Sequence, residues 1–344
     1  MNVINILNTI RANASALYQE RIPEATADNL KELGGTIINY APARNEFCDA
    51  IINKIAFTHV RSRAYKNPLS ILKKERKPFG TDIEDIYTNP AKAHVFDSSN
   101  TGNLLAVKKA DVKTMYHRMN RKDQYEVSIS IPELQLAFTS QVEFEKFLNS
   151  KIQSLYNGDE MDEYLLMRNI FVDAVTKGYL KTIEVDYNGD ETTSKDLVKL
   201  IKTLSGDFTF AKGDFNGYNV LNATDIAEGT ITQCVTWTPK ENQVLLIRND
   251  VDANTDVEVL AKAFNMEKTD FIKRKMIVDS FGDTNTLCVL MDDALTEFRD
   301  NFYSVEEFHN GSSLVRTYFL HHWQTLSLTL FANAVVIKAK ATSE

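Results

Sequence analysis

Short apolar runs separated by turn residues dominate the last hundred residues of the chain. Three runs end at Asp-rich or Asn-rich stretches, as buried strands do, and occupy residues 244–247, 276–278 and 287–291. Between the first two runs, helical spacing of apolar residues predicts a helix carrying Val257, Leu260, Ala261 and Phe264. A last apolar run covers residues 326–337. The expected order is therefore strand, helix, strand, strand and terminal strand.

Two helices are predicted in the middle of the chain, on either side of Asn157-Gly158. Ser140 and Glu143 form a capping box for the first helix, and Asp159 can cap the second, which ends at Gly178. The pattern then predicts three further segments: a strand at 182–187, a short helix at 194–204 and a loop at 206–229.

The first 138 residues have weaker patterns. Residues 1–53 are predicted to be helical, with Gly34-Gly35 ending a helix, and without a core of their own. Residues 54–138 hold four of the seven prolines, and 125–131 alternates apolar and polar residues as a half-exposed strand does. We expect a long protruding hairpin there. A two-stranded ribbon buries too little surface to be stable alone, so its partner should be a neighbouring molecule.

The order of C-terminal elements, ending in the "FANAVVIKA" strand, resembles the C-terminal half of major capsid proteins of tailed bacteriophages, particularly small short-tailed phages. This resemblance implies an α+β fold with an N-terminal arm, an extended hairpin loop, a peripheral domain with a long spine helix, and an axial domain. The corresponding segments are 1–53, 54–138, 139–189 with 311–344, and 190–310. The break at Asn157-Gly158 leaves open which helix is the spine.

Composition is that of an ordinary globular protein, with 344 residues of which 43% are apolar and 25% charged. The net charge of −8 argues against an affinity of the whole protein for nucleic acid or an anionic membrane. Three cysteines form no disulfide framework and fit a reducing compartment. No signal peptide and no apolar stretch of membrane-spanning length is evident.

No motif indicates a catalytic, cofactor or metal site. The histidines lie in no HExxH pattern, and His321 and His322, adjacent in a strand, point to opposite faces, so structural roles are expected. Residues 250–256 resemble a DxDxNxD calcium loop but have Thr255 and Ala261 where glycine and glutamate are needed, which favours a helix start. Cys288 is predicted to be a core residue.

A basic run provides the candidate intersubunit contacts, which are Arg61, Arg63, Lys66, Lys73, Lys74, Arg76 and Lys77. Three interpretations stay open: a solvated surface, contact with acidic surfaces of neighbouring copies, and contact with DNA.

The resemblance implies a major capsid protein whose pentamers and hexamers form an icosahedral or prolate head around double-stranded DNA, without sequence-specific contact. It also implies a portal and a scaffolding protein as partners, a place in the virion, and assembly in the cytoplasm of a host bacterium. No cofactor, membrane association or enzymatic activity is expected. The alternatives are an encapsulin-like cellular shell protein and an enzyme with a site assembled from scattered residues.

Overall fold

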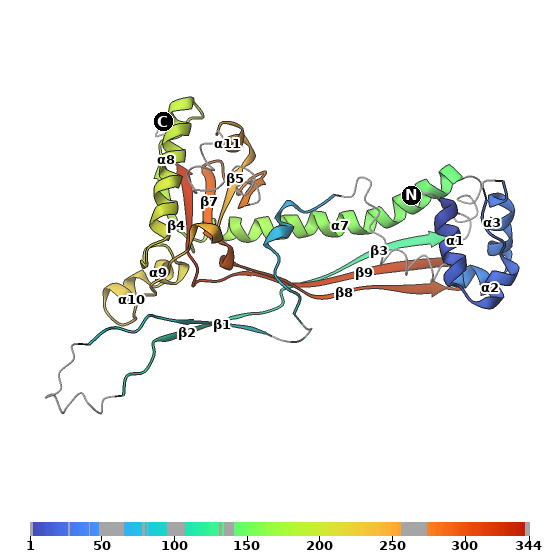
Figure 1. Ribbon diagram of the computed structural model, residues 1–344, viewed down its shortest axis with the longest axis horizontal. Helices are drawn as coiled ribbons and strands as arrows, with labels where there is room; N and C mark the ends of the chain where they lie inside the picture. Colours follow the sequence, from blue (N-terminus) through green and yellow to red (C-terminus); the bar gives the residue numbers. More distant parts are fainter. Residues whose placement is uncertain are drawn as a thin grey trace. The chain divides into compact units, whose positions relative to one another are not determined.

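The computed structural model describes residues 3–26, 28–40, 42–47, 65–77, 80, 82–94, 107–130, 133, 141–255 and 274–340. The chain divides into two compact units (Figure 1). The first consists of residues Met1–Asn67, Arg121–Glu163 and Asp300–Gln324, and the second of Pro68–Asn120, Tyr164–Arg299 and Thr325–Glu344. The predicted helix carrying Val257 to Phe264 lies outside the described residues.

Three short helices open the first unit: α1 (Val3–Asn13), α2 (Ala16–Arg21) and α3 (Leu30–Asn39). They bury a core of their own, made of Leu7, Ile10, Tyr18, Ile22, Ala25, Leu30, Leu33, Ile37, Ile38, Ala43 and Phe47. The prediction that this segment lacks a core is therefore wrong. Each helix contributes only a few buried positions, so none shows a long apolar stripe. The prediction that Gly34-Gly35 ends a helix is also wrong, because α3 buries Gly34 on the same side as Leu33 and Ile37.

A single helix, α7 (Gln141–Thr176), replaces the two that the pattern predicted. Asn157 and Gly158 lie inside it. The Asn157 side chain accepts a hydrogen bond from the Tyr65 amide at 3.0 Å, and a Cβ added to Gly158 would lie 3.4 Å from the Tyr125 ring. A helical glycine costs only about 1 kcal/mol, and Asn157 makes its contact with a residue far away in the sequence, so the local signal does not end the helix. Asp159 is then an interior helix position rather than a cap.

The first unit also contains a three-stranded sheet in the order β3-β9-β8. Its strands are β3 (Arg121–Ser130), β8 (Thr296–Asn310) and β9 (Val315–Leu328). β3 runs antiparallel to β9, from Arg121 opposite Gln324 to Ser130 opposite Val315. The predicted strand at 125–131 is thus confirmed through Ser130, and its partner is a strand almost two hundred residues further along the chain.

A five-stranded mixed sheet in the order β4-β10-β7-β5-β6 forms the centre of the second unit. Its strands are β4 (Lys181–Val185), β5 (Gln243–Arg248), β6 (Lys275–Val278), β7 (Thr286–Asp292) and β10 (Ala334–Ala339). The strands predicted at 244–247, 276–278 and 287–291 are confirmed, whereas the last run, 326–337, is divided between the end of β9 and β10. Val244 and Leu246 pack in the same core as Phe171 of α7, whereas Leu245 and Ile247 pack in the core that includes α8. Both faces of β5 and β7 are covered, so these strands are apolar at 244–247 and 287–291, whereas the edge strand β4 carries exposed polar residues and Ile277 of the edge strand β6 is 40% exposed.

The remaining helical elements of the second unit are η1 (Pro68–Leu72), α8 (Glu191–Phe208), α9 (Gly217–Leu221), α10 (Ala223–Ala227), η2 (Lys240–Asn242), α11 (Asn249–Ala253) and η3 (Asp293–Leu295). The short helix predicted at 194–204 is confirmed within α8. The loop predicted at 206–229 is wrong, since α9 and α10 lie there. Helices of five residues are too short to show periodicity, and α9 depends on the side-chain cap of Asn216.

A two-stranded ribbon belongs to the second unit and pairs β1 (Ile83–Thr88) with β2 (Val112–His117). One face of the ribbon is attached to that unit. Tyr87 donates a hydrogen bond to the Val235 carbonyl and stacks on Phe331. Asp85 accepts a hydrogen bond from Thr329. Part of the predicted hairpin segment therefore folds onto its own chain, and η1 supplies core residues of this unit.

Gly282 provides a test of the packing of α7 in the second unit. Its φ is +82°, and an added Cβ would lie 2.5 Å from Val172 Cγ1. We expect Gly282→Ala to lower the free energy of unfolding by about 2–4 kcal/mol, since a left-handed conformation and a steric clash add together. Urea denaturation measures this. Gly229→Ala is the matched control, because Gly229 has a φ of +74° and open space around it. Equal losses in the two variants would contradict the proposed clash.

Candidate functional site

The predicted intersubunit contacts differ in their surroundings. Arg61 and Arg63 lie outside the described residues. Among the others, the exposed side chains are Lys66 and Arg76, and the partly buried ones are Lys73, Lys74 and Lys77. The run is therefore not one uniformly solvated surface.

Lys74 is bound within the second unit. Its Nζ lies 2.5 Å from Glu297 Oε1 and donates to the Ala294 carbonyl at 3.2 Å, and its backbone amide donates to Phe298 at 2.8 Å. Burial alone would raise the pKa of Glu297, but hydrogen bonds from Lys74 and Arg299 outweigh it and lower that pKa. Lys74 thus has a structural role, whereas Arg76 is an exposed candidate for contact with another molecule.

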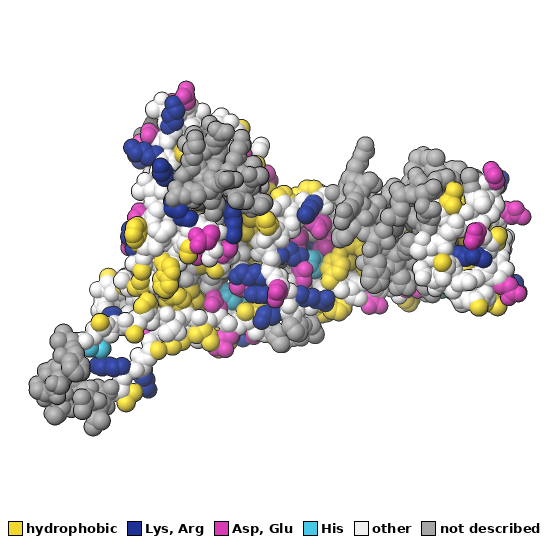
Figure 2. All heavy atoms as spheres, viewed as in Figure 1, with side chains coloured by type: hydrophobic (Ala, Val, Ile, Leu, Met, Phe, Trp, Pro, Cys, Tyr) yellow, Lys and Arg dark blue, Asp and Glu magenta, His cyan; other side chains and the backbone are white. Residues whose placement is uncertain are grey.

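The second face of the β1–β2 ribbon is exposed and partly apolar. Ile86 is 56% exposed, Val112 49% and Tyr116 58%. They alternate with the attached residues, so they lie together on the face opposite Tyr87 and Asp85. Figure 2 shows hydrophobic side chains along this ribbon. We call Ile86, Val112 and Tyr116 the ribbon face.

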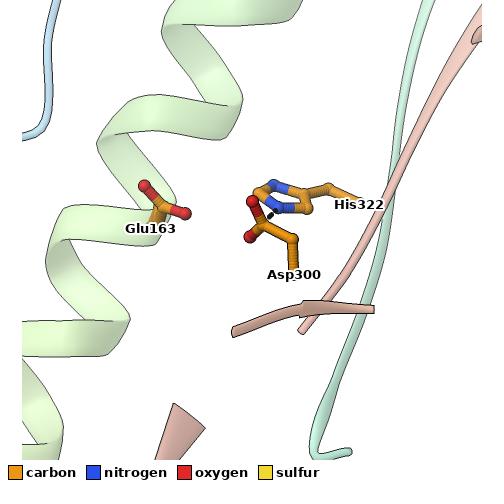
Figure 3. A group of neighbouring side chains, drawn as sticks. All are labelled: Glu163, Asp300 and His322. Atoms are coloured by element: carbon orange, nitrogen blue, oxygen red, sulfur yellow. Dashed lines mark hydrogen bonds and ion pairs between the residues drawn. The ribbon is translucent and has the colours of Figure 1, made fainter. Parts of the chain in front are cut away.

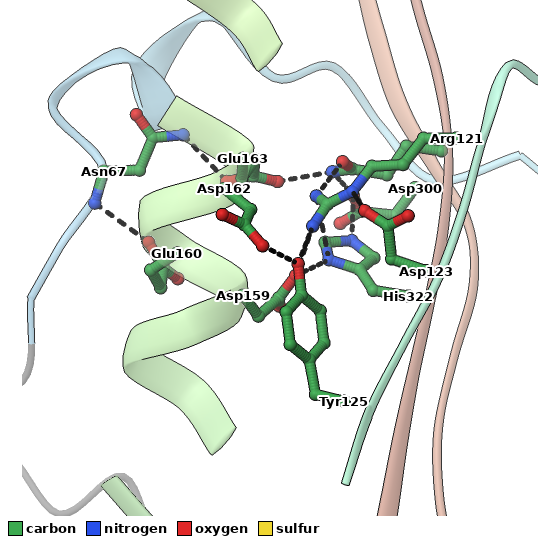
Figure 4. Close-up of polar contacts among 11 residues, drawn as sticks. Asn67, Arg121, Asp123, Tyr125, Asp159, Glu160, Asp162, Glu163, Asp300 and His322 are labelled. Carbon is green, nitrogen blue, oxygen red and sulfur yellow. Dashed lines mark hydrogen bonds and ion pairs between the residues drawn. The ribbon is translucent and has the colours of Figure 1, made fainter. Parts of the chain in front are cut away.

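A buried polar network lies in the first unit, between α7 and the three-stranded sheet (Figure 4). On α7, Asp159 and Glu163 follow Leu155 at intervals of four residues, so all three share one helix face. On the sheet, Arg121 lies opposite Gln324 and Asp123 opposite His322. Paired residues of antiparallel strands point to the same side. The helix face and the sheet face therefore bring charged groups from distant parts of the sequence together.

Arg121 lies at the centre of this network and is 4% exposed. Its guanidinium donates to Asp159 Oδ1 at 2.8 Å, to Asp123 Oδ2 at 2.6 Å, to Gln324 Oε1 at 2.5 Å and to Tyr125 Oη at 2.9 Å. Burial alone would lower the pKa of Arg121, but the carboxylates of Asp123 and Asp159 outweigh it and raise that pKa. The guanidinium stays charged and compensates carboxylates that would be costly to bury alone.

His322 lies between two carboxylates. Its Nδ1 is 2.6 Å from Asp159 Oδ1, and its Nε2 is 3.1 Å from Asp300 Oδ1. The imidazole is 3% exposed. Burial would lower the pKa of His322, but hydrogen bonds to Asp159 and Asp300 outweigh it, so that pKa is raised. His322 is therefore a structural histidine, as predicted, whereas His321 stacks on Phe319.

Glu163, Asp300 and His322 place potential ligand atoms within 4.8 Å of one another (Figure 3), a set of donors that could hold a divalent cation. However, the amide nitrogen of Gln324 donates to Glu163 Oε1 and, at 2.7 Å, to Asp300 Oδ1. Arg121 fixes the orientation of that amide by donating to its oxygen. The carboxylate oxygens that would bind a cation thus already accept hydrogen bonds from the Gln324 amide, so their hydrogen bonding is satisfied by protein groups.

Sequence reasoning missed this network. The available signal was a pair of acidic residues, Asp159 and Glu163, on the apolar face of a helix. The predicted break at Asn157-Gly158 concealed it, because Leu155 was assigned to one helix and both acids to another.

The other sequence candidates lie elsewhere. The residues that resemble a calcium loop include two aspartates of α11. Asp250 accepts a hydrogen bond from Arg248 at 2.5 Å, and Asp252 forms an ion pair with Lys275 at 2.6 Å. Cys288 is fully buried, and burial raises the pKa of its thiol to about 12, which confirms a core residue. Among the described helices, none is long and apolar enough to cross a membrane.

Comparisons with known proteins agree along nearly the whole chain. A family model described as "Phi29-like phage major capsid protein" matches residues 7–338. The major capsid protein of Bacillus phage PZA is 32% identical over 335 residues, covering 96% of this chain and 72% of that protein. The major capsid protein of Streptococcus phage Cp-1 is 28% identical, with 96% of this chain and 92% of that protein covered.

Solved structures show the same fold. A chain of the capsid of Staphylococcus phage Andhra has a TM-score of 0.66 at 12% identity, covering 82% of this chain and 86% of that chain. A chain from the structure of the head fiber and inner core protein gp22 of native bacteriophage P68 has a TM-score of 0.60 at 13% identity, with the same coverage. At these identities the likeness establishes fold alone, and it confirms the expected fold class.

Proposed function

The chain belongs to the Phi29-like phage major capsid protein family, and on that premise we propose that its copies close into pentameric and hexameric capsomers of a head enclosing double-stranded DNA. Members of this family are structural proteins, so the chain is a shell-forming virion component and not an enzyme. The predicted function is confirmed at this level, and neither alternative is favoured. The finer proposal includes an icosahedral or prolate shell, a scaffolding protein, a portal, and assembly in the host cytoplasm.

We further propose the domain division expected from the sequence, with 1–53 as arm, 54–138 as extended loop, 139–189 with 311–344 as peripheral domain, and 190–310 as axial domain. α7 is the proposed spine helix, because it is a continuous helix of 36 residues.

The observation that carries the capsomer proposal is the ribbon face. Ile86, Val112 and Tyr116 are large apolar groups left in solvent on a ribbon whose other face is attached to its own chain. In a closed ring, one surface of each copy meets a different surface of the next, so every copy can cover its neighbour's ribbon. The direct test is electron microscopy of the full chain co-expressed with its scaffolding protein. Five-fold and six-fold capsomers are expected, and a single small oligomer would overturn the proposal.

The basic run gives a second test. We expect Arg76→Glu to reduce assembly about tenfold or more, because an exposed charge placed against an acidic neighbour would become repulsive. The measurement is the fraction of protein sedimenting as particles. Lys74→Glu is the contrasting variant: it breaks the pair with Glu297 and should lower the free energy of unfolding of the subunit itself. Unchanged assembly of Arg76→Glu would make Arg76 part of the solvated surface.

A further inference from the structure

Two carboxylates hold His322 from opposite sides. Asp159 comes from α7 and contacts Nδ1, and Asp300 comes from β8 and contacts Nε2. His322 itself lies on β9, next to Arg121 of β3, whose Nη1 is 3.4 Å from Nδ1. One imidazole therefore connects α7 with β8 and β9 of the sheet in the first unit.

Both contacts require a particular protonation state. A neutral imidazole has one N–H and one lone pair, whereas an imidazolium donates from both nitrogens. If His322 lost its proton, one of the two carboxylate oxygens would face a lone pair at hydrogen-bonding distance. That contact would change from a charge-assisted hydrogen bond into a repulsion.

The other groups around His322 act on the same equilibrium. The charged and titratable residues that face it or its partners among the described residues are Asp159, Asp162 and Glu163 of α7, Arg121, Asp123 and Tyr125 of β3, and Asp300 and Tyr303 of β8. Arg121 opposes protonation of His322, but Asp123 and Asp159 bind that guanidinium directly. Carboxylates outnumber cations in this set, which favours the imidazolium.

We propose that His322 is a proton-dependent latch that holds α7 against the three-stranded sheet of the first unit. When His322 is protonated, it donates hydrogen bonds to both Asp159 and Asp300, and these bonds hold α7 against β8 and β9. When His322 is neutral, one of these two hydrogen bonds is lost, and α7 separates locally from the sheet more often. The attachment of α7 to the sheet therefore depends on pH.

The direction of the pH effect follows from the contacts. The pKa of His322 in the folded chain is raised above its ordinary value of about 6.5. The stabilisation is then fully present below pH about 6.5 and is lost as the pH rises through the folded-state pKa. The latch is closed in mildly acidic solution and opens on the alkaline side.

Hydrogen–deuterium exchange of the full chain tests this at pH about 6 and at about one pH unit above the titration midpoint of His322, after correction for intrinsic exchange rates. We expect the protection of α7 amides around residues 155–163 to fall about tenfold at the higher pH, as loss of one charge-assisted hydrogen bond implies. His322→Gln should show the low protection at both values. His321→Gln is the matched control, because it removes the adjacent histidine of the same strand, and it should keep the pH dependence.

Exchange at the imidazole C2 position, followed by mass spectrometry, gives the titration midpoint of His322 in the unaltered protein even if His322→Gln fails to fold. We expect this midpoint above about 6.5. A midpoint at or below that value would overturn the latch. So would unchanged α7 protection in the wild type, or a pH dependence that survives in His322→Gln.

Discussion

Replacing Arg121 with methionine is expected to lower the free energy of unfolding by about 3–5 kcal/mol, the usual cost of removing one partner from a buried ion pair. The buried carboxylate of Asp159 would lose the guanidinium that lies 2.8 Å away, and Asp123 and Gln324 would lose donors as well. Methionine keeps much of the side-chain volume, so the loss reports on charge more than on packing. Urea denaturation of the unassembled subunit, followed by circular dichroism, measures the effect.

Lys122→Met is the control for Arg121→Met. Lys122 is the next residue of β3, is exposed, and has a cation–π contact with Trp323 at 5.6 Å. Its replacement also removes one positive charge, and it should lower the free energy of unfolding by about 1 kcal/mol or less. Combining Arg121→Met with Asp159→Leu should recover part of the stability, because an apolar pair replaces an unpaired charge. A loss in Arg121→Met no larger than that in Lys122→Met would show that the network contributes little.

Replacing the ribbon face, in the triple variant Ile86→Ser, Val112→Ser and Tyr116→Ser, is expected to abolish shell assembly and leave the subunit folded. These side chains are about half exposed in the isolated chain, so their loss removes little intramolecular packing. In the proposed shell, each buried apolar anchor contributes about 1–2 kcal/mol, and the loss recurs in every copy. We expect a drop in particle yield of at least about a hundredfold by gradient sedimentation and negative-stain imaging.

The conservative triple variant Ile86→Val, Val112→Ile and Tyr116→Phe keeps an apolar ribbon face and should assemble nearly as well as the wild type. The phenolic contact of Tyr116 with Glu84 at 3.0 Å is lost in both triple variants, so it cannot explain a difference between them. Normal particles from the serine variant would show that no neighbour covers this face. Unfolding of the serine variant, seen by circular dichroism, would instead assign these residues to the fold.

A deletion of residues 60–120 would not test the ribbon face by itself. It removes Leu69 and Leu72, which are buried in the core of the second unit, together with the ribbon. The prolines and polar residues around Leu69 and Leu72 give this segment the pattern of a protruding hairpin, so its few core positions do not stand out in the sequence. Point variants on the ribbon face avoid that confusion.

Elements with a local signal could be predicted from the residue pattern. The apolar runs at 244–247 and 287–291 are the strands β5 and β7, whose two covered faces need apolar side chains at successive positions, and the run at 276–278 is the edge strand β6. The alternating residues of 125–130 became a strand with one buried face. The order of these elements was enough to identify the fold class and the resemblance to capsid proteins.

The contacts between distant segments became known from the folded chain. Asn157-Gly158 has the local signal of a helix end because glycine has a low helix propensity, but α7 continues, and Asn157 accepts a hydrogen bond from Tyr65, a residue far away in the sequence. The same holds for the network: Asp159 and His322 are 163 residues apart in sequence and 2.6 Å apart in space. Pairing energies between such groups depend on burial and distance, which no local pattern of residue types contains.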